Sequence, residues 1–356
     1  MTPVRIAVVG LGYWGPNIVR NLFELECADV AAVCDQRSER LDMIRRRFSG
    51  FDCHTDFEHV LADDTIDAVA IATPVSSHYR LSRAALEAGK HVFVEKPLAA
   101  SSAECIELIR LASECGRVIM PGHTFLYSPP VVTIQELIRS HALGKLYFIS
   151  TSRVNLGLHQ PDVSVMWDLG PHDFSILQFW LDETPEYVST LSRGFVMRSI
   201  PDVAFVDLEF ASGAIAHVEL SWLAPSKLRR TTIVGSEKMV VYDDTSPEPV
   251  RIFDSGVVLP EPETFGEYRL TYRTGDIVSP RVEATEPLSL ELRDFCDAIV
   301  TGSTPRSSAL LGLEVVRTIE AVDHSRDLGG SRVEVAAFDP MTLVPGSPAA
   351  EATPRL

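Results

Sequence analysis

The sequence predicts an α/β protein in which an N-terminal, doubly wound parallel sheet is followed by an α+β domain with an open, mostly antiparallel sheet. Three observations predict this class. The chain has 356 residues, more than one typical domain. Up to about residue 122, short β-branched runs alternate with helical patterns, as in a parallel sheet with crossover helices. Beyond it, strand-like runs follow one another directly, which indicates antiparallel pairing.

The N-terminal elements follow in order from this alternation of apolar runs and amphipathic stretches. Strands are expected at Val4–Val9, Asp29–Cys34, Ala68–Ala72, His91–Val94 and Arg117–Pro121. Helices are expected at Trp14–Leu25, Ser38–Phe48, Asp56–Leu61 and Ser76–Ala88, with a further one after the capping box Ser101-x-x-Glu104. The first domain is therefore predicted to span residues 1–122.

The second domain is predicted to span residues 123–330. Its expected strands are Leu146–Val154, Val188–Met197, Val203–Phe210, Ala214–Trp222, Arg229–Gly235 and Lys238–Tyr242, with turns at Gly213 and at Ser236-Glu237. Helices are expected at Pro171–Leu181, Leu288–Val300 and Ala309–Ser325, the last two packing back on the body. Residues 331–356 form a C-terminal extension whose end, from Pro340, we expect to be disordered.

Composition and charge exclude several classes of function. The formal net charge of −17 argues against nucleic acid or an anionic membrane as a partner. No apolar run is long enough to span a membrane, and the N-terminus does not resemble a signal peptide, so we expect a cytoplasmic protein. The 6 cysteines show neither CxxC nor Cys/His ligand spacing, which predicts buried free thiols and no metal site.

A dinucleotide fingerprint opens the chain. Gly10-x-Gly12-x-x-Gly15 follows a predicted strand and begins a helix, where glycines allow a tight turn and close approach to a pyrophosphate. Asp35 ends the next strand and is placed to accept hydrogen bonds from the adenosine ribose. Together these elements predict a Rossmann domain. The Asp35 carboxylate favours NAD over NADP because it repels a 2′-phosphate, whereas the nearby Arg37 is the counter-argument.

Two further motifs carry a family resemblance: Ala72-Thr73-Pro74 with His78 downstream, and Glu95-Lys96-Pro97 at a strand end. With the fingerprint, they resemble the Gfo/Idh/MocA family of sugar and cyclitol oxidoreductases, over nearly the whole chain to about residue 330. The resemblance implies a Rossmann domain, an open-sheet domain and a nicotinamide at their junction. It also implies that the Lys96-Pro97 peptide is commonly cis. The expected cofactor contacts are Gly10, Gly12, Tyr13, Trp14, Gly15, Asp35, Arg37, Thr73, Pro74, His78, Glu95, Lys96 and Trp167.

Lys96 is also a candidate on physical grounds. A lysine at the carboxyl end of a parallel strand points into the crevice where α/β folds bind ligands. A cationic nicotinamide nearby disfavours its charged form, so this lysine is suited to hold or pass on the proton of a hydroxyl group. The alternative is a surface salt bridge with Glu95.

A second catalytic segment is Trp167-Asp168-Leu169-Gly170-Pro171-His172-Asp173. Asp168 and His172 are four residues apart, so both lie on one face if the helix begins near Asp168. Pro171 is tolerated within a first turn, which predicts that the pair lies at the helix start. Alone, such a pair is more often structural; the family's matching positions form a catalytic Asp/His pair beside the lysine. We therefore predict Lys96, Asp168 and His172 as catalytic.

The substrate is the least determined feature. The segments around His123, Arg153 and Trp167 resemble a subgroup that oxidises the C3 hydroxyl of a UDP-N-acetylhexosamine-type sugar, on a route to amino sugars. The expected substrate contacts are Lys96, His123, Tyr127, Arg153, Asn155, Asp168, His172 and Arg229. Tyr127 is equally compatible with the core, Arg153 with an internal ion pair and Arg229 with a solvated strand edge.

Three functions compete. The first is NAD-dependent oxidation of a nucleotide-linked or aminoglycoside-type sugar, and the second is an inositol or free monosaccharide dehydrogenase; either can run in reverse as a ketosugar reductase. The third is a non-catalytic, NAD-binding regulator, against which the presence of Lys96, Asp168 and His172 together argues. A cofactor recycled in place would need a second substrate such as a 2-oxo acid. By resemblance, we expect a homodimer or homotetramer formed through the open sheet.

Overall fold

The computed structural model describes residues 2–157, 159, 163–258 and 271–336; the tail expected from Pro340 lies outside them. The described chain divides into two units. The first extends to Tyr127 and includes Thr285–Arg317, and the second comprises Ser128–Ala284 and Thr318–Ala336. The sequence analysis assigned residues 285–317 to the second domain. This segment clusters with the first unit because Phe295 packs against Phe93, with ring centroids 5.9 Å apart, and Glu286 pairs with Arg20 at 2.5 Å.

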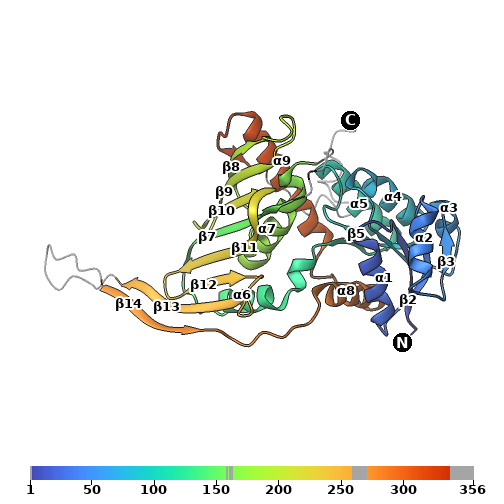
Figure 1. Ribbon diagram of the computed structural model, residues 1–356, viewed down its shortest axis with the longest axis horizontal. Helices are drawn as coiled ribbons and strands as arrows, with labels where there is room; N and C mark the ends of the chain where they lie inside the picture. Colours follow the sequence, from blue (N-terminus) through green and yellow to red (C-terminus); the bar gives the residue numbers. More distant parts are fainter. Residues whose placement is uncertain (1, 158, 160–162, 259–270, 337–356) are drawn as a thin grey trace. The chain divides into compact units, whose positions relative to one another are not determined.

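The first unit is built on a parallel sheet. Within the described residues it has six strands, in the order β3-β2-β1-β4-β5-β6. They are β1 (Val4–Val9), β2 (Ala28–Cys34), β3 (Asp52–His54), β4 (Ala68–Ile71), β5 (His91–Glu95) and β6 (Ile119–Gly122). Figure 1 labels β2, β3 and β5 of this sheet. The helical elements are α1 (Gly15–Glu24), α2 (Ser38–Arg45), α3 (Phe57–Leu61), η1 (Val75–Ser77), α4 (His78–Glu87), α5 (Ser102–Cys115), η2 (Thr124–Tyr127) and α8 (Pro287–Thr301). The central strands are apolar and buried, as expected for strands with helices on both faces.

The second unit contains a large, mostly antiparallel sheet. Among the described residues its nine strands follow the order β14-β13-β12-β11-β7-β10-β9-β8-β15, and only β10 and β7 pair in parallel. They are β7 (Leu146–Leu156), β8 (Tyr187–Arg193), β9 (Val203–Glu209), β10 (Ile215–Ser221), β11 (Leu223–Gly235), β12 (Met239–Asp243), β13 (Val250–Val258), β14 (Thr271–Val278) and β15 (Val333–Glu334). Its helices are α6 (Pro129–Arg139) and α7 (Val165–Leu181), and α9 (Ala309–Asp327) ends in this unit. The sheet domain agrees with the predicted class, although β13, β14 and β15 were not predicted.

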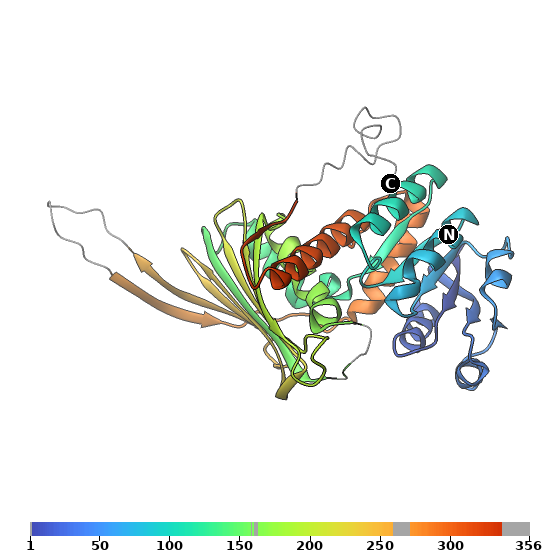
Figure 2. The ribbon, with the colours of Figure 1, turned by 90° about the horizontal axis from the view of Figure 1, so that it is seen from above.

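The two faces of this sheet differ. On β10, Ala216, Val218 and Leu220 are buried, whereas Ile215 and His217 on the opposite face are exposed. Figure 2 shows the helices α7 (green) and α9 (red) on one face, and no helix of the described chain covers the other. The strand therefore alternates between a buried and an exposed face, as in a sheet covered on one side.

The start of α7 corrects the sequence prediction. The helix begins at Val165, after the N-cap Ser164, so Pro171 lies inside it rather than in its first turn. A proline there removes one helical hydrogen bond and restricts the residue before it. That residue is Gly170, which has no Cβ to clash; a Cβ there would lie 2.9 Å from the Phe174 ring. Asp168 and His172 still lie one turn apart on the same helix.

Three further features of the described residues concern membrane-spanning helices, metal sites and cysteines. None of their helices is both long and apolar enough to cross a membrane. They contain no group of three or more His, Cys, Asp or Glu residues arranged to hold a metal ion. Of the free cysteines, Cys34, Cys105 and Cys296 are buried, whereas Cys115 is exposed and Cys27 and Cys53 are half-buried. The prediction of buried thiols therefore holds for part of the set.

Candidate active site

Two glycines of the loop after β1 lie where a side chain would not fit. Gly10 has φ +90°, and a Cβ on it would lie 2.7 Å from both the Ala72 carbonyl oxygen and the Thr73 Cγ2. A Cβ on Gly15 would collide with the Gly10 carbonyl oxygen. Helix α1 begins at Gly15, so the positive end of its dipole lies at the loop; Pro16 has no N–H, and the Asn17 N–H donates to the Trp14 carbonyl oxygen at 2.9 Å. This is the local geometry that a pyrophosphate requires.

Asp35, the residue after β2, forms hydrogen bonds that hold the same loop. Its Oδ2 accepts a hydrogen bond from the Leu11 N–H at 2.8 Å, and its Oδ1 accepts one from the Arg37 N–H at 2.9 Å. The Arg37 guanidinium lies 3.5 Å from Asp35 and is 61% exposed, against 6% for the Asp35 side chain. Arg40, which the sequence analysis missed, donates to the Leu11 carbonyl at 2.7 Å. Asp35 and Arg40 therefore hold both sides of the Leu11 backbone.

Tyr13 and Trp14 occupy the tip of the glycine loop. Their rings meet edge to face with centroids 5.5 Å apart, and Tyr13 is 82% exposed. Two exposed aromatic side chains beside a cofactor loop are available for contact with a bound molecule. Their predicted role as cofactor contacts stays a prediction.

His78 connects the two family motifs through their backbones. Its Nδ1 lies 2.8 Å from the Pro97 carbonyl oxygen and its Nε2 lies 2.9 Å from the Thr73 carbonyl oxygen. The ring is 1% exposed, and burial lowers its pKa. The sequence analysis expected His78 to contact the cofactor. In the structure both ring nitrogens face protein carbonyls, so any effect on the cofactor passes through the Thr73-Pro74 segment.

The lysine motif lies at the carboxyl end of β5. The Lys96–Pro97 peptide bond is cis, and Lys96 is half-buried. Glu95 is buried, and burial raises the pKa of its carboxyl group to about 7. Glu95 pairs in register with Gly122 on β6, where a side chain would lie 3.4 Å from the Glu95 Oε2.

Two predicted substrate residues follow β6. His123 is 1% exposed, and neither ring nitrogen has a hydrogen-bond partner among the described residues. Burial, and then the charge of Lys96, lower its pKa to about 3, so the ring is neutral. Tyr127 is buried; its hydroxyl donates to Asp294 at 2.6 Å and accepts from the Ser307 N–H at 3.0 Å. Tyr127 therefore matches the core interpretation rather than a substrate contact.

The second unit supplies Asp168 and His172 from α7. The Asp168 Oδ2 accepts a hydrogen bond from the indole N–H of Trp222 at 3.1 Å, and Trp222 is 1% exposed. The preceding Trp167 donates to Asp323 at 2.7 Å within the same unit. Trp167 was predicted to contact the cofactor, and its indole N–H is bonded to Asp323 of α9.

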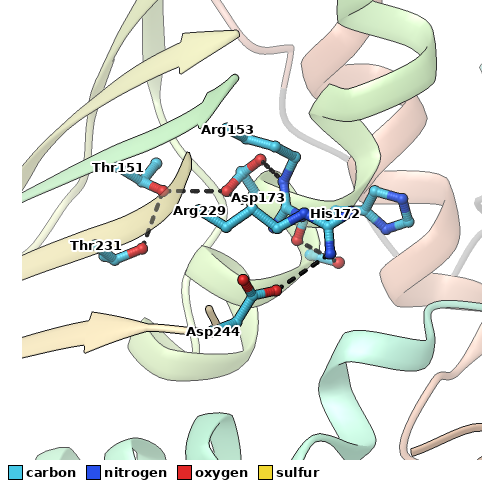
Figure 3. A network of polar contacts seen from close by, with 8 residues as sticks. Thr151, Arg153, His172, Asp173, Arg229, Thr231 and Asp244 are labelled. Carbon is cyan, nitrogen blue, oxygen red and sulfur yellow. Dashed lines mark hydrogen bonds and ion pairs between the residues drawn. The ribbon is translucent and has the colours of Figure 1, made fainter. Parts of the chain in front are cut away.

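A buried polar network flanks His172 (Figure 3). Asp173 is directed at Arg153 and Thr151, while the His172 ring points the other way. The Arg153 Nε lies 2.5 Å from Asp173 Oδ2, and the Thr151 hydroxyl donates to Asp173 Oδ1 at 3.1 Å. The Thr231 hydroxyl donates in turn to Thr151 at 2.9 Å. Arg153 is therefore an internal ion-pair residue, which was the alternative to substrate binding.

The remaining predicted substrate residues lie on the strands around this network. Arg229 on β11 pairs with Asp244 at 3.1 Å, and its side chain is 32% exposed. Asn155 is half-buried near the end of β7. Arg229 thus belongs to an ion pair in the second unit, and Asn155 remains a candidate substrate contact.

Comparisons with known proteins agree with both units. A model described as "Oxidoreductase family, NAD-binding Rossmann fold" matches residues 4–123, and one described as "GFO/IDH/MocA C-terminal domain" matches residues 131–241. The chain is 29% identical to the 2,7-anhydro-N-acetylneuraminate hydratase of Mediterraneibacter gnavus, over 62% of each protein, which is less than two thirds of that relative's length. It is 27% identical to a D-xylose 1-dehydrogenase (NADP(+)) of Haloferax volcanii, over 85% of this chain and 91% of that one. The crystal structure of GenD2 from gentamicin A biosynthesis in complex with NAD aligns with a TM-score of 0.80 at 26% identity, covering 95% and 97% of the two chains.

Proposed function

Because the chain belongs to the Gfo/Idh/MocA family of oxidoreductases, whose NAD-binding Rossmann domain forms its first unit, we propose that it oxidises a secondary hydroxyl of a sugar to a ketone with NAD⁺. The observation that carries this proposal is Lys96 at the end of β5, beside the cis Lys96–Pro97 bond, in a chain that also carries Asp168 and His172 one turn apart on α7. The reverse reaction would reduce a ketosugar.

The residues around the glycine loop fit NAD. Gly10 and Gly15 have no side chain where the loop packs most closely, and the N-terminus of α1 presents the positive end of its dipole to a pyrophosphate. The Asp35 carboxylate is placed to accept from ribose hydroxyls and to repel a 2′-phosphate. Arg37 and Arg40 argue in the other direction, as does the NADP named for the Haloferax relative. GenD2 was solved with NAD, and we propose NAD as the cofactor.

The proposed chemistry assigns one role to each catalytic side chain. Bound NAD⁺ supplies the hydride acceptor. His172 takes the proton of the substrate hydroxyl, and Asp168, held by Trp222, stabilises the resulting imidazolium. Lys96 hydrogen-bonds the same oxygen and assists the transfer of its proton to His172. Oxidation of the alcohol then releases one proton and transfers one hydride, so charge and atoms balance.

For the substrate, we propose a nucleotide-linked or aminoglycoside-type sugar oxidised at C3. The likeness to GenD2, a protein of gentamicin A biosynthesis, supports an amino-sugar route. The likeness to a D-xylose dehydrogenase favours the alternative, a free monosaccharide or inositol as substrate. The ion pairs of Arg153 and Arg229 weaken the argument for a diphosphate contact at these two residues.

Activity with a panel of sugars tests the proposal. NADH formation would be followed with UDP-N-acetylhexosamines, aminoglycoside sugars, D-xylose and myo-inositol, with and without a 2-oxo acid that would recycle a tightly held cofactor. We expect turnover with a sugar, and a rise in melting temperature with that sugar and NAD⁺ together. Absence of NADH and of any thermal shift across the panel would support the non-catalytic regulator instead.

Variants test the assigned roles. Lys96→Met and His172→Ala should each abolish turnover while the Kd for NAD⁺ changes little. The matched controls are Lys145→Met and His324→Ala, which change the same residue types at exposed positions. Near-normal kcat in Lys96→Met or His172→Ala would contradict the mechanism.

We also propose a homodimer or homotetramer that buries the uncovered face of the large sheet. This face exposes Phe148, Phe205, Leu191 and Ile215 on four adjacent strands, with exposures between 38% and 58%. An apolar patch of this kind marks an interaction surface. Light scattering should give a multiple of the 39.2 kDa chain mass, and a monomer at micromolar concentration would contradict it.

A further inference from the structure

A second buried carboxyl group lies within electrostatic reach of Glu95. Glu291 on α8 is 0% exposed, and its charge interacts with that of Glu95 on β5. The two elements are packed together through the edge-to-face contact of Phe93 with Phe295, whose ring centroids are 5.9 Å apart. Gly122 on β6 leaves the space that the Glu95 side chain fills. Glu95 and Glu291 are thus two buried carboxyl groups on elements that are packed together, and Lys96 follows Glu95 in the chain.

Each of the two carboxyl groups has one oxygen without a hydrogen-bond partner among the described residues. The Thr124 hydroxyl donates to Glu291 Oε2 at 2.6 Å, but Glu291 Oε1 and Glu95 Oε1 are enclosed and have no hydrogen-bond partner among the described residues. An unpaired buried carboxylate oxygen is costly, and two carboxylates that share a buried site cannot both ionise easily. Retention of at least one proton on the pair removes most of this cost.

Several ionisable groups face this pair from the elements packed around it. They come from β5, from the segment after β6 and from α8: Lys96, His123, Tyr127 and Asp294. His123 is neutral because burial lowers its pKa to about 3, and burial raises the pKa of Tyr127. Lys96 is therefore the cationic group that lowers the pKa of Glu95, against the larger effect of burial. The charges of Glu95 and Lys96 are coupled, and the coupling acts in both directions.

We propose that Glu95 and Glu291 form a buried proton-holding pair, and that the charge on Glu95 sets how readily Lys96 gives up its own proton. When Glu95 is ionised, its carboxylate stabilises the Lys96 ammonium; when Glu95 is protonated, Lys96 is deprotonated more easily. Glu291 acts through Glu95, because a second carboxyl group close by disfavours Glu95 ionisation. Both are positioning residues, and the inference rests on the proposed role of Lys96 in proton transfer.

The first test measures Lys96 directly and needs no substrate. Competitive labelling with acetic anhydride across a range of pH, read out by peptide mass spectrometry, gives the pH at which the Lys96 amine becomes reactive. Glu95→Gln keeps the shape of the side chain and removes its charge, so it should move this midpoint down by about one pH unit. Glu314→Gln is the matched control, because Glu314 on α9 is also partly buried and pairs with Arg317. It should leave the midpoint unchanged.

A second measurement keeps the proposal testable if the Glu95→Gln variant fails to fold. Infrared spectra of the wild-type protein at pH 7 should show the carbonyl band of a buried, protonated carboxylic acid, and Glu291→Gln should remove part of it. An unshifted Lys96 midpoint in folded Glu95→Gln, or no such band that depends on Glu291, would overturn the proposal.

The kinetic consequence separates this inference from the proposed function. With an active sugar, the rising limb of kcat against pH should move to lower pH in Glu95→Gln, while KM changes little. If no sugar is oxidised, the proposed function fails, whereas the labelling and infrared results still decide whether the pair controls Lys96.

Discussion

Arg153 on β7 and Asp173 on α7 form an ion pair whose side chains are 6% and 4% exposed, with Nε and Oδ2 2.5 Å apart. Asp173 directly follows His172, so this pair attaches the turn of α7 that carries His172 to the sheet. The Thr151 and Thr231 hydroxyls extend the attachment to a second strand. The residue expected to bind substrate instead holds the helix that carries the proposed base.

Loss of the Asp173 charge should therefore destabilise the second unit strongly. Asp173→Asn removes the charge that pairs directly with the buried Arg153 guanidinium, which costs about 3–5 kcal/mol of unfolding free energy. Urea denaturation followed by tryptophan fluorescence is suited to the measurement, because Trp167, Trp180 and Trp222 all lie in this unit.

The control is Glu209→Gln, which breaks the exposed ion pair with Arg332 in the same unit, where the side chains are 46% and 50% exposed. Solvent screens that pair, so its loss should change the midpoint far less. Equal midpoints for the two variants would show that the buried pair contributes no more than an exposed one.

Features of the site that depend on residues close together in the sequence could be predicted, whereas contacts between residues far apart in the sequence could not. The glycine fingerprint, Asp35 and the Lys96 motif were predicted because each depends on a few residues at fixed spacing. The pairing of Thr124 with Glu291 joins residues 167 positions apart, and nothing in either segment indicates the other. For Arg153, the sequence left substrate binding and an internal ion pair open, because a buried arginine and a substrate-binding arginine look alike until the partner, here Asp173, is known.

Two features of the fold, strand β14 and the start of α7, also differ from the sequence prediction for physical reasons. Strand β14 (Thr271–Val278) has charged residues and mostly exposed side chains, so it lacks the apolar alternation that signals a strand. The sequence predicts too late a start for α7 because proline is normally tolerated in a first turn, whereas Gly170 makes the interior Pro171 tolerable.

Cofactor choice should depend on the charge of Asp35. Asp35→Asn removes the carboxylate that repels a 2′-phosphate but keeps an oxygen that can accept from the Leu11 N–H. Arg37 and Arg40 then face the phosphate without a competing negative charge. We expect kcat/KM with NADP⁺ to rise about tenfold relative to NAD⁺, a difference near 1.4 kcal/mol. An unchanged ratio would mean that Asp35 does not select the cofactor.

Acid should destabilise the first unit through His91. The Val118 N–H donates to its Nδ1 at 2.9 Å, which requires an unprotonated nitrogen, and burial lowers the pKa from 6.5 to about 4. Because the folded-state pKa is below the unfolded one, the unfolded chain binds the extra proton between about pH 6.5 and 4. Stability should therefore fall by about 2 kcal/mol as the pH drops through this window.

Thermal unfolding at a series of pH values checks the role of His91. His91→Asn retains an acceptor for the Val118 N–H and removes the titrating ring, so its melting temperature should fall less between pH 6.5 and 4. The same change at the exposed His59 of α3 serves as the control. Parallel curves for wild type and His91→Asn would assign the acid sensitivity to other groups.

His78 should matter for catalysis although it faces only backbone. His78→Phe keeps a ring in place but removes the N–H that the imidazole donates to the carbonyl oxygen of either Thr73 or Pro97. The lost hydrogen bonding costs about 1–2 kcal/mol of stability. It also releases the cofactor segment and the lysine segment from one another, so KM for NAD⁺ should rise and kcat should fall about tenfold.

Tyr79→Phe on the same helix removes a hydrogen bond to Glu107 and should change neither constant. If His78→Phe lowers the melting temperature and leaves both constants intact, His78 is structural only.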